Sequence, residues 1–202
     1  MDAKTRILKT SRELFFSTGF SGTTVEDISA GLGISKKTFY KTFPDKNTLL
    51  HEVIFSHIDS IEEKIKKIMT AGKTPLIKRF KGMTEAIIEG ASKISPVFLR
   101  DVRKNAPELW EEINKRRKGL FLKYFSRVIK ESMELGLMRK DLDKELVILV
   151  YLTAIENVIN PQVLSEMEYS AGEVIDVIIT MFFEGLLTDK GRKNLKQLKQ
   201  GV

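Results

Sequence analysis

Apolar residues recur every three to four positions through most of this chain, which is the spacing of one buried face of an α-helix. A long helix is predicted to begin after Asp45 and to reach a break at Ala71-Gly72, with an apolar face made of Leu49, Val53, Ile54, Ile58, Ile61, Ile65 and Ile68. Proline and glycine signals at Pro96, Pro107, Gly136 and Pro161 separate further predicted helices at 75–90, 96–104, 107–135, 143–159 and 171–187. No convincing run alternates as a strand would, so the pattern predicts an all-α fold.

The segment just before this long helix is predicted to form two short helices joined by a tight turn. Thr23 followed by Glu26 predicts a capping box, and Ser35 and Asp45 are further N-cap candidates. Gly33 falls at the turn, where a positive φ favours glycine. Two facing apolar surfaces flank the turn, with Val25, Ile28 and Leu32 before it and Ile34, Phe39 and Phe43 after it. This arrangement predicts a helix-turn-helix.

The second short helix has a basic face. Phe39 and Phe43 point to one side of a helical wheel, and an arc of about 140° on the other side holds Lys36, Lys37, Tyr40 and Lys41. Ammonium and hydroxyl donors suit phosphate oxygens and guanine edges, and an α-helix fits the major groove of duplex DNA. The alternative is an ordinary solvated lysine face, but the caps, the glycine turn and the apolar pattern favour DNA binding.

The excess positive charge lies in two short segments. The chain has 202 residues and a formal net charge of +7, of which residues 33–46 carry +3 and residues 189–202 carry +4. Such concentration on one helix indicates a polyanionic partner more than a need for solubility. The C-terminal basic residues either touch nucleic acid or, more simply, complement the dipole at the end of a helix in a fraying terminus.

These residues carry a family resemblance. Residues 5 to about 50 resemble the DNA-binding domain of TetR-family transcriptional regulators, most clearly at Phe20, Thr23-Thr24-Val25, Asp27-Ile28, Gly33-Ile34-Ser35-Lys36, Thr38-Phe39-Tyr40, Phe43 and Lys46-Asn47-Thr48-Leu49-Leu50. The resemblance implies a three-helix DNA-binding domain at 1–46 and a helical effector-binding and dimerisation domain at 47–202. The function it implies is a ligand-responsive regulator, expected to be a repressor, that binds a (pseudo)palindromic operator as a homodimer and is released by a small molecule.

The resemblance also implies individual DNA contacts. Thr24 and Ser35 are expected near the DNA backbone, and the recognition helix is expected to begin with Lys36, Lys37 and Thr38. Phosphate or base contacts are expected from Tyr40, Thr42 and Lys46. The family commonly has glycine at the position of Lys37, so the added charge here either reads a base or strengthens phosphate binding.

Two late segments are apolar over more than one helical face. One contains Leu146, Val147, Leu149, Val150, Leu152 and Ala154, and the other contains Val174, Ile175, Ile178, Ile179, Phe182, Phe183 and Leu186. The resemblance implies that two such helices from each of two chains form a four-helix dimer interface. The alternative is deep burial within one chain.

The middle of the chain is where a ligand pocket is expected, because such pockets are mostly apolar with a few polar groups. Candidate lining residues are Phe80, Met83, Phe98, Trp110, Phe121, Tyr124, Phe125 and Tyr151, with Asn157 or Glu156 as a polar handle. Each of these also suits a plain hydrophobic core. The family expectation is that the effector shifts the long helix after Asp45 and so changes the spacing of the two DNA-binding units.

Composition narrows the alternatives. The chain has no cysteine, which excludes disulfides, cysteine-ligated zinc and a thiol nucleophile. No secretory signal is apparent, and the longest apolar run, Leu146 to Ile155, is too short to span a bilayer, so a cytoplasmic protein is expected. We expect no cofactor, no metal and no membrane partner.

Four motif fragments resemble enzyme sites without completing one. His51-Glu52 has Phe55 where a zinc motif needs its second histidine, and Gly72-Lys73-Thr74 lacks the first glycine of a phosphate-binding loop. Gly31-Leu32-Gly33 lacks the third glycine of a dinucleotide fingerprint, and Gly19-Phe20-Ser21-Gly22 lacks the nucleophile-elbow spacing. A non-enzyme is therefore expected. The alternative is a helical small-molecule-binding protein or enzyme whose basic helix is incidental.

Overall fold

The computed structural model describes residues 2–71, 74–158, 163 and 168–200. Over these residues the chain forms ten helices and no strand, which confirms the all-α prediction: α1 (Ala3–Thr18), α2 (Val25–Leu32), α3 (Lys36–Thr42), α4 (Lys46–Thr70), α5 (Leu76–Ala91), α6 (Pro96–Asn105), α7 (Pro107–Glu134), α8 (Lys144–Val158), α10 (Ala171–Leu186) and α11 (Asp189–Gln200). Every predicted helix after residue 70 begins and ends within one residue of an observed one. The predicted break signals Gly72 and Pro161 lie outside the described residues.

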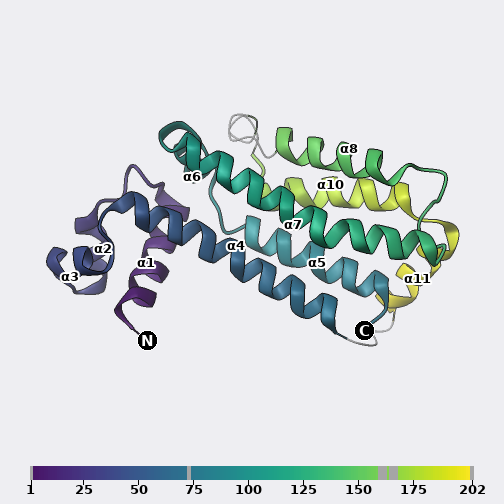
Figure 1. Cartoon of the computed structure of the whole chain (residues 1–202), viewed down its shortest axis with the longest axis horizontal. Helices are drawn as coiled ribbons and strands as arrows, with labels where there is room; N and C mark the ends of the chain where they lie inside the picture. Colours follow the sequence, from purple (N-terminus) through teal and green to yellow (C-terminus); the bar gives the residue numbers. More distant parts are fainter. Residues whose placement is uncertain (1, 72–73, 159–162, 164–167, 201–202) are drawn as a thin grey trace.

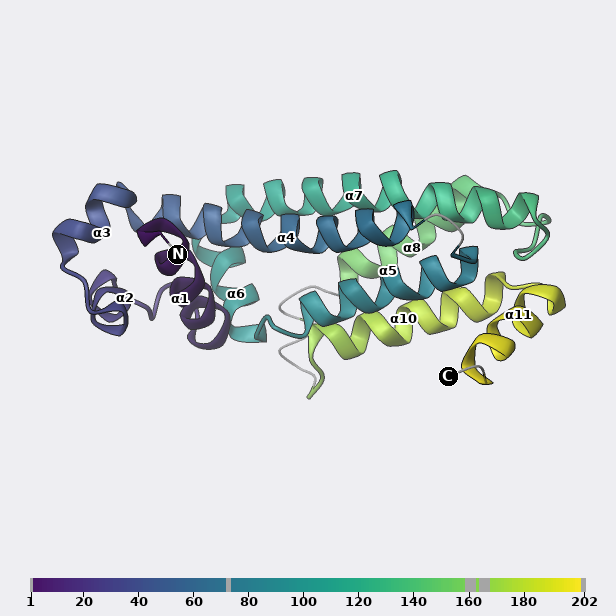
Figure 2. The same cartoon turned by 90° about the horizontal axis from the view of Figure 1, so that it is seen from below.

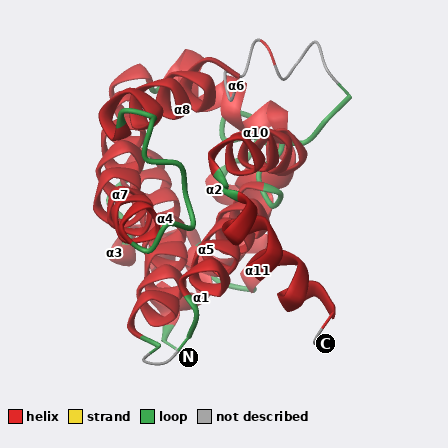
Figure 3. Cartoon of the chain, turned by 90° about the vertical axis from the view of Figure 1, so that its right-hand side faces the viewer, coloured by secondary structure: helices red, strands yellow, loops and turns green. Residues whose placement is uncertain are grey.

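The molecule is elongated, with helices α1, α2 and α3 at one end (Figure 1). We call these three helices the N-terminal unit. Helix α4 runs from this unit into a bundle with α5, α7, α8 and α10, and a view turned by 90° shows the same order (Figure 2). Seen from the end that carries α11, the bundle helices surround a common interior (Figure 3).

Two hydrophobic cores lie along this axis. The first joins Phe15, Ile28, Phe39 and Phe43 of the N-terminal unit to the first half of α4 and to Phe98 of α6. The second fills the bundle between α4, α5, α7, α8 and α10. Helix α4 contributes side chains to both cores, so packing is continuous across the position after Lys46 where the domain boundary was predicted.

The helix-turn-helix is capped as predicted at two of three positions. The hydroxyl of Ser35 accepts the backbone N–H of Thr38 at 3.1 Å, and the carboxylate of Asp45 accepts that of Thr48 at 2.7 Å. Gly33 ends α2 with φ 64°, in the left-handed region that glycine tolerates best.

The predicted capping box at Thr23 and Glu26 is wrong by one residue. Thr24 caps α2, and the side chain of Asp27 accepts the backbone N–H of Thr24 at 2.8 Å. Thr23 is buried, and its hydroxyl donates to the carbonyl of Gly19 at 2.8 Å. Either of the two adjacent threonines could cap α2 by its local sequence. Because Thr23 is buried and bonded to Gly19, Thr24 is the cap.

The C-terminal segment forms helix α11 instead of a frayed tail. Lys190 donates to the carbonyl of Leu135 at 3.0 Å, just past the end of α7, and Arg192 donates to the carbonyl of Leu187 at 3.1 Å. These bonds satisfy carbonyls at helix C-termini, as the dipole explanation expects. Helix α11 lies at the opposite end of the molecule from α3, so within one chain the two basic segments are far apart (Figure 1).

Helices α8 and α10 pack against each other along one edge of the bundle (Figure 1). Part of their apolar surface is buried within this chain, at Leu152, Ile175, Ile179, Phe183 and Leu186. Another part is exposed, at Leu146, Leu149, Val150, Val177 and Met181. Burial within one chain therefore accounts for one apolar face of these helices, and the other face is exposed in a single chain.

Candidate DNA-binding surface and ligand cavity

Helix α3 is held by two phenylalanines that have no exposed surface. Phe39 and Phe43 pack in the first core with ring centroids 6.1 Å apart. Because both occupy the inner face, the opposite face of the helix is left to solvent, with Lys36, Lys37, Tyr40 and Lys41 all exposed. Tyr40 is 51% exposed, and its ring meets the edge of Phe39 at 5.3 Å. The predicted basic arc is therefore an accessible surface.

The polar residues on this surface differ in how they are engaged. Lys36 forms an ion pair with Glu26 of α2, which fixes one lysine beside the turn. Lys37 and Lys41 have no ion-pair partner within the described ranges. The hydroxyl of Ser35 lies 3.0 Å from that of Thr38, and the hydroxyl of Thr42 donates to the carbonyl of Thr38 at 3.3 Å. Lys37, Tyr40 and Lys41 are thus the members most available to a partner.

Lys46 occupies a structural position. Its ammonium group donates to the carbonyls of Phe20 and Thr23, both at 3.0 Å, and lies 4.3 Å from the centre of the Phe20 ring. An ammonium group has three donors, and two of them are used here. Lys46 therefore ties the start of α4 to the loop between α1 and α2. Thr24 is likewise engaged in its capping box.

A carboxylate on α6 binds the same loop from the other side. The backbone N–H and the hydroxyl of Ser21 both donate to Asp101 at 2.5 Å, and Asn105 donates to Asp101 at 2.6 Å. Partial burial acts to raise the pKa of Asp101, but these hydrogen bonds outweigh it and hold the pKa below its ordinary value. The sequence offered no signal for this contact, because its partners are eighty residues apart.

A cavity of about 200 Å³ lies between α4, α5, α6, α7, α8 and α10. Six of the ten candidate residues line it, namely Phe98, Trp110, Phe121, Tyr124, Phe125 and Tyr151. Phe80 lines a separate cavity of about 20 Å³, and Met83 is fully buried in the second core. Asn157 is exposed and donates to the carbonyl of Thr153 in its own helix at 2.8 Å. The side chain of Glu156 lies outside the described residues.

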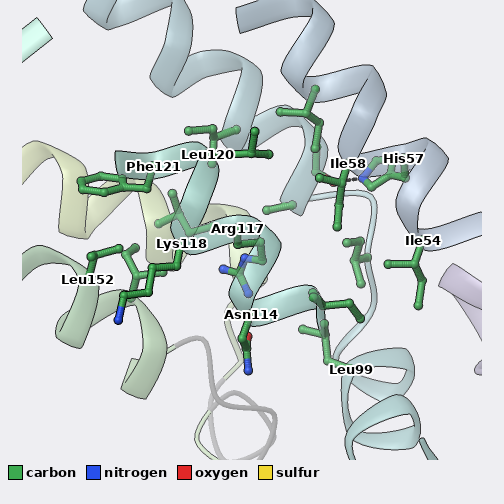
Figure 4. Close-up of a pocket in the computed structure, with 18 of the residues that line it drawn as sticks. Ile54, His57, Ile58, Leu99, Asn114, Arg117, Lys118, Leu120, Phe121 and Leu152 are labelled. Atoms are coloured by element: carbon green, nitrogen blue, oxygen red, sulfur yellow. Dashed lines mark hydrogen bonds between the residues drawn. The ribbon is translucent and has the colours of Figure 1, made fainter. Parts of the chain in front are cut away.

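The polar lining comes mainly from residues that the sequence analysis did not select. Asn114, Arg117 and Lys118 of α7 line the cavity together with His57 of α4. In Figure 4, the Arg117 guanidinium lies among the lining side chains, while the ends of Asn114 and Lys118 lie on the side away from His57 and Ile58. Charged residues on a long helix normally face water, so the sequence gives no signal for a cavity at these positions. A cavity on that face becomes visible only once α4 and α8 are placed.

His57 is the most buried of these polar residues. Its Nε2 lies 3.1 Å from the carbonyl oxygen of Gly90 on α5 and donates to it. Burial lowers the pKa of His57, although the bond to Gly90 opposes this effect, so the imidazole is neutral at pH 7. His57 therefore contributes a fixed contact between α4 and α5 and no charge to the cavity.

The cavity shares side chains with the N-terminal unit. Ile54, Ile58, Phe98 and Val102 belong to the first core and also line the cavity. Phe16 of α1 lines it too, with its ring centroid 5.0 Å from those of both His57 and Phe98. The cavity wall and the core that holds the N-terminal unit therefore have these side chains in common.

Two further findings limit the kind of site. Within the described ranges, no group of three or more His, Asp or Glu side chains is arranged to hold a metal ion. None of the helices in the described part of the chain combines the length and apolarity needed to cross a bilayer.

Comparison with known proteins covers nearly the whole chain. Residues 7–53 match the family model described as bacterial regulatory proteins, tetR family, and residues 50–185 match the model of the YsiA-like protein, C-terminal region. The HTH-type transcriptional repressor DhaR of Mycobacterium sp. strain GP1 is 24% identical over 191 residues, covering 90% of each chain. The fatty acid metabolism regulator protein of Bacillus subtilis strain 168 is 21% identical over 185 residues, covering 90% of this chain and 94% of that one.

Solved structures show the same fold. The fatty acid degradation regulator FadR from Bacillus halodurans superposes with a TM-score of 0.67 at 18% identity, covering 92% of this chain and 97% of that one. The two family models together span both the helix-turn-helix and the bundle that contains the cavity. The basic face of α3 and the cavity thus occur together in one recognised architecture, and the chain belongs to the TetR family of bacterial transcriptional regulators.

Proposed function

We propose that this regulator binds a (pseudo)palindromic operator as a homodimer, represses transcription and is released by a small apolar effector with an anionic head group. The exposed basic face of α3, held in place by fully buried Phe39 and Phe43, is the observation that carries the DNA-binding part. Lys37, Tyr40 and Lys41 supply donors to phosphates and base edges. Lys46 and Thr24 act mainly by positioning the helix-turn-helix, since their polar groups are already bonded.

The exposed apolar face of α8 and α10 supports the dimer. Five large apolar side chains of this face are exposed to solvent in a single chain, namely Leu146, Leu149, Val150, Val177 and Met181. A contiguous exposed apolar patch usually marks an interaction surface. A two-fold arrangement pairs this patch with its own copy. The result is two α3 helices, which must lie about 34–36 Å apart to enter successive major grooves.

The chemistry of the cavity supports an acyl-type effector. Its lining is mostly isoleucine, leucine and aromatic side chains, which suit an apolar body. Lys118 and Arg117 place positive charge beside this apolar space, and Asn114 adds an amide. A fatty acid, with its carboxylate, meets both requirements, and so does a fatty acyl coenzyme A thioester, whose head group carries phosphates. Two relatives named for fatty acid regulation are consistent with this effector class.

Release follows from the shared packing. An effector that fills the cavity contacts Ile54 and Ile58 of α4 and Phe98 of α6. The hydroxyl of Tyr124, also in the lining, donates to Glu62 of α4 at 3.0 Å, so movement of α7 is passed to α4 as well. Differential binding of the effector to one arrangement of α4 and α6 shifts the population away from the DNA-binding arrangement.

Two titrations test this function. Binding to duplex DNA should weaken steeply as salt rises, because phosphate contacts release counterions. Adding fatty acids or their coenzyme A thioesters to the complex should then dissociate it. Salt-insensitive DNA binding would favour the alternative of a helical ligand-binding protein with an incidental basic helix. Salt-sensitive binding that no acyl compound reverses would reject the effector class alone.

The dimer face is tested by Met181→Asp. Met181 is 71% exposed in one chain, so the fold of the monomer should be unchanged. In the dimer the carboxylate would be buried against apolar surface, which should weaken association by about 3 kcal/mol, or about a hundredfold. Sedimentation measures this, with Leu135→Asp just past the end of α7 as the control at an exposed apolar residue outside α8 and α10. A Met181→Asp protein that remains a dimer at wild-type affinity places the interface elsewhere.

The contact between α6 and the N-terminal unit is tested by Asp101→Asn. Loss of charged hydrogen bonds to Ser21 should lower the free energy of unfolding by about 1 kcal/mol, allowing for partial solvent exposure. Since the pKa of Asp101 is depressed in the folded protein, this difference from wild type should be present at neutral pH, begin to shrink near pH 3.8 and disappear as pH falls through the lower pKa of the folded protein. Urea unfolding measures it. Asp141→Asn, which breaks a surface pair with Arg139, is the control, and equal effects of the two changes would contradict a specific role for Asp101.

A further inference from the structure

Three aromatic side chains separate the ligand cavity from the second, smaller cavity. Phe121 and Phe125 of α7 and Tyr151 of α8 line both cavities, and we call them the aromatic wall. The Phe121 ring stacks on Tyr151 with centroids 4.4 Å apart and on Phe125 with centroids 4.5 Å apart. The wall is therefore a continuous stack of rings with open space on both sides.

The space behind the wall is small and apolar. It measures about 20 Å³, and apart from Tyr151 every residue that lines it has a hydrocarbon side chain. Phe80 and Phe183 stack there with centroids 4.0 Å apart, and Phe80 meets Phe125 edge-on at 5.5 Å. This lining would accept a hydrocarbon chain if the wall were opened, but no charged group.

The two ends of the ligand cavity differ in how readily they yield. Phe16, Ile54 and Val102 close one end, and all three are buried in the core that holds the N-terminal unit. The wall closes the other end, and its member Phe121 is only half-buried, unlike Phe125 and Tyr151. Figure 4 shows Phe121 on the opposite side of the cavity from Ile54 and Leu99. Extra length in a ligand can thus be accommodated at Phe121 with the least cost in packing.

The size of the cavity explains why the end closed by the aromatic wall matters for ligand binding. Small-molecule pockets usually measure about 300–1,000 Å³, whereas the cavity in front of the wall measures about 200 Å³. Opening the wall would join the small space behind it to this cavity and so lengthen the room for a hydrocarbon chain. We propose that the Phe121 ring determines effector selectivity by setting the maximum length of the apolar chain. This inference rests on the proposed acyl-type effector and adds which chain lengths it takes.

The test is a binding series of saturated fatty acids and their coenzyme A thioesters of increasing length. For the wild-type protein, affinity should rise about fourfold with each added methylene that becomes buried, which corresponds to about 0.8 kcal/mol, and should then stop rising at a definite length. For Phe121→Ala the same slope should continue to longer chains, because the two cavities merge. Comparing the fatty acids with the coenzyme A thioesters shows whether the preferred head group is a carboxylate or the phosphate-bearing coenzyme A.

Ile129→Ala is the matched control, because Ile129 lines the small cavity but not the ligand cavity. It enlarges the space behind an intact wall, so its length limit should equal that of the wild type. Operator binding without effector reports that each variant is folded. If Phe121→Ala does not fold, Phe121→Leu is the milder change. An unchanged limit in a folded Phe121 variant would overturn the inference. Failure of every acyl compound to bind proteins that still bind DNA would reject the effector class, and the length limit with it.

Discussion

Phe39→Ala should abolish DNA binding while leaving the helical bundle folded. Phe39 has no exposed surface and packs against Phe43 within the first core. Truncating a buried phenylalanine costs about 3–5 kcal/mol, which is a large share of the stability of a small helical unit. The second core does not include Phe39. Duplex titration should show loss of binding, and calorimetry should show the N-terminal unit unfolding at a lower temperature than the bundle.

Tyr40→Phe is the matched control for this change. Tyr40 is the next residue along α3 but is exposed, and phenylalanine keeps the ring that meets Phe39. The control should stay folded and weaken DNA binding modestly, through loss of one hydroxyl contact. A Phe39→Ala protein with wild-type affinity for DNA would show that α3 is not the helix that binds.

The double change Lys37→Ala with Lys41→Ala should produce the largest loss of DNA affinity among surface variants. Both lysines are exposed on α3, and neither has an ion-pair partner in the described part of the chain. Each phosphate contact contributes about one unit to the slope of log affinity against log salt. A dimer of this variant lacks two lysines on each of its two α3 helices, so its slope should fall by about four units. Titration of operator DNA at several salt concentrations measures the slope directly.

A second double variant controls for net charge. Lys64→Ala with Lys66→Ala removes the same number of charges from exposed positions in the second half of α4. Its slope should stay close to that of the wild type. Equal slopes for the two double variants would mean that general attraction, and not contact by α3, accounts for binding. If only one single variant, Lys37→Ala or Lys41→Ala, alters which bases are preferred, that lysine reads a base.

The helices were largely predictable because their signals are local. Pro96 and Pro107 begin helices, Ser35 and Asp45 cap them, and Gly33 ends one, and each acts within a few residues of its own position. The cap of α2 was predicted one residue too early because the sequence gives Thr23 and Thr24 the same local capping signal. Only burial of Thr23 by tertiary packing selects Thr24 as the cap.

The candidate site was predictable on α3 and only partly so in the cavity. The aromatic residues were found because pockets and cores share the same composition, and for this reason Met83 was selected with them although it is plain core. Arg117 and Lys118 were missed because a charged residue on a long helix normally faces water. The bond between Asp101 and Ser21 was missed because no sequence pattern connects residues so far apart.

In the proposed complex, α3 reads DNA as one of a symmetric pair. Selecting duplexes from a random pool with the intact protein, and sequencing those retained, tests it most directly. A symmetric pair of α3 helices should enrich a site made of two inverted half-sites whose centres are about one helical turn apart. Retention of no sequence above the background of the pool, or of single unpaired half-sites only, would contradict it.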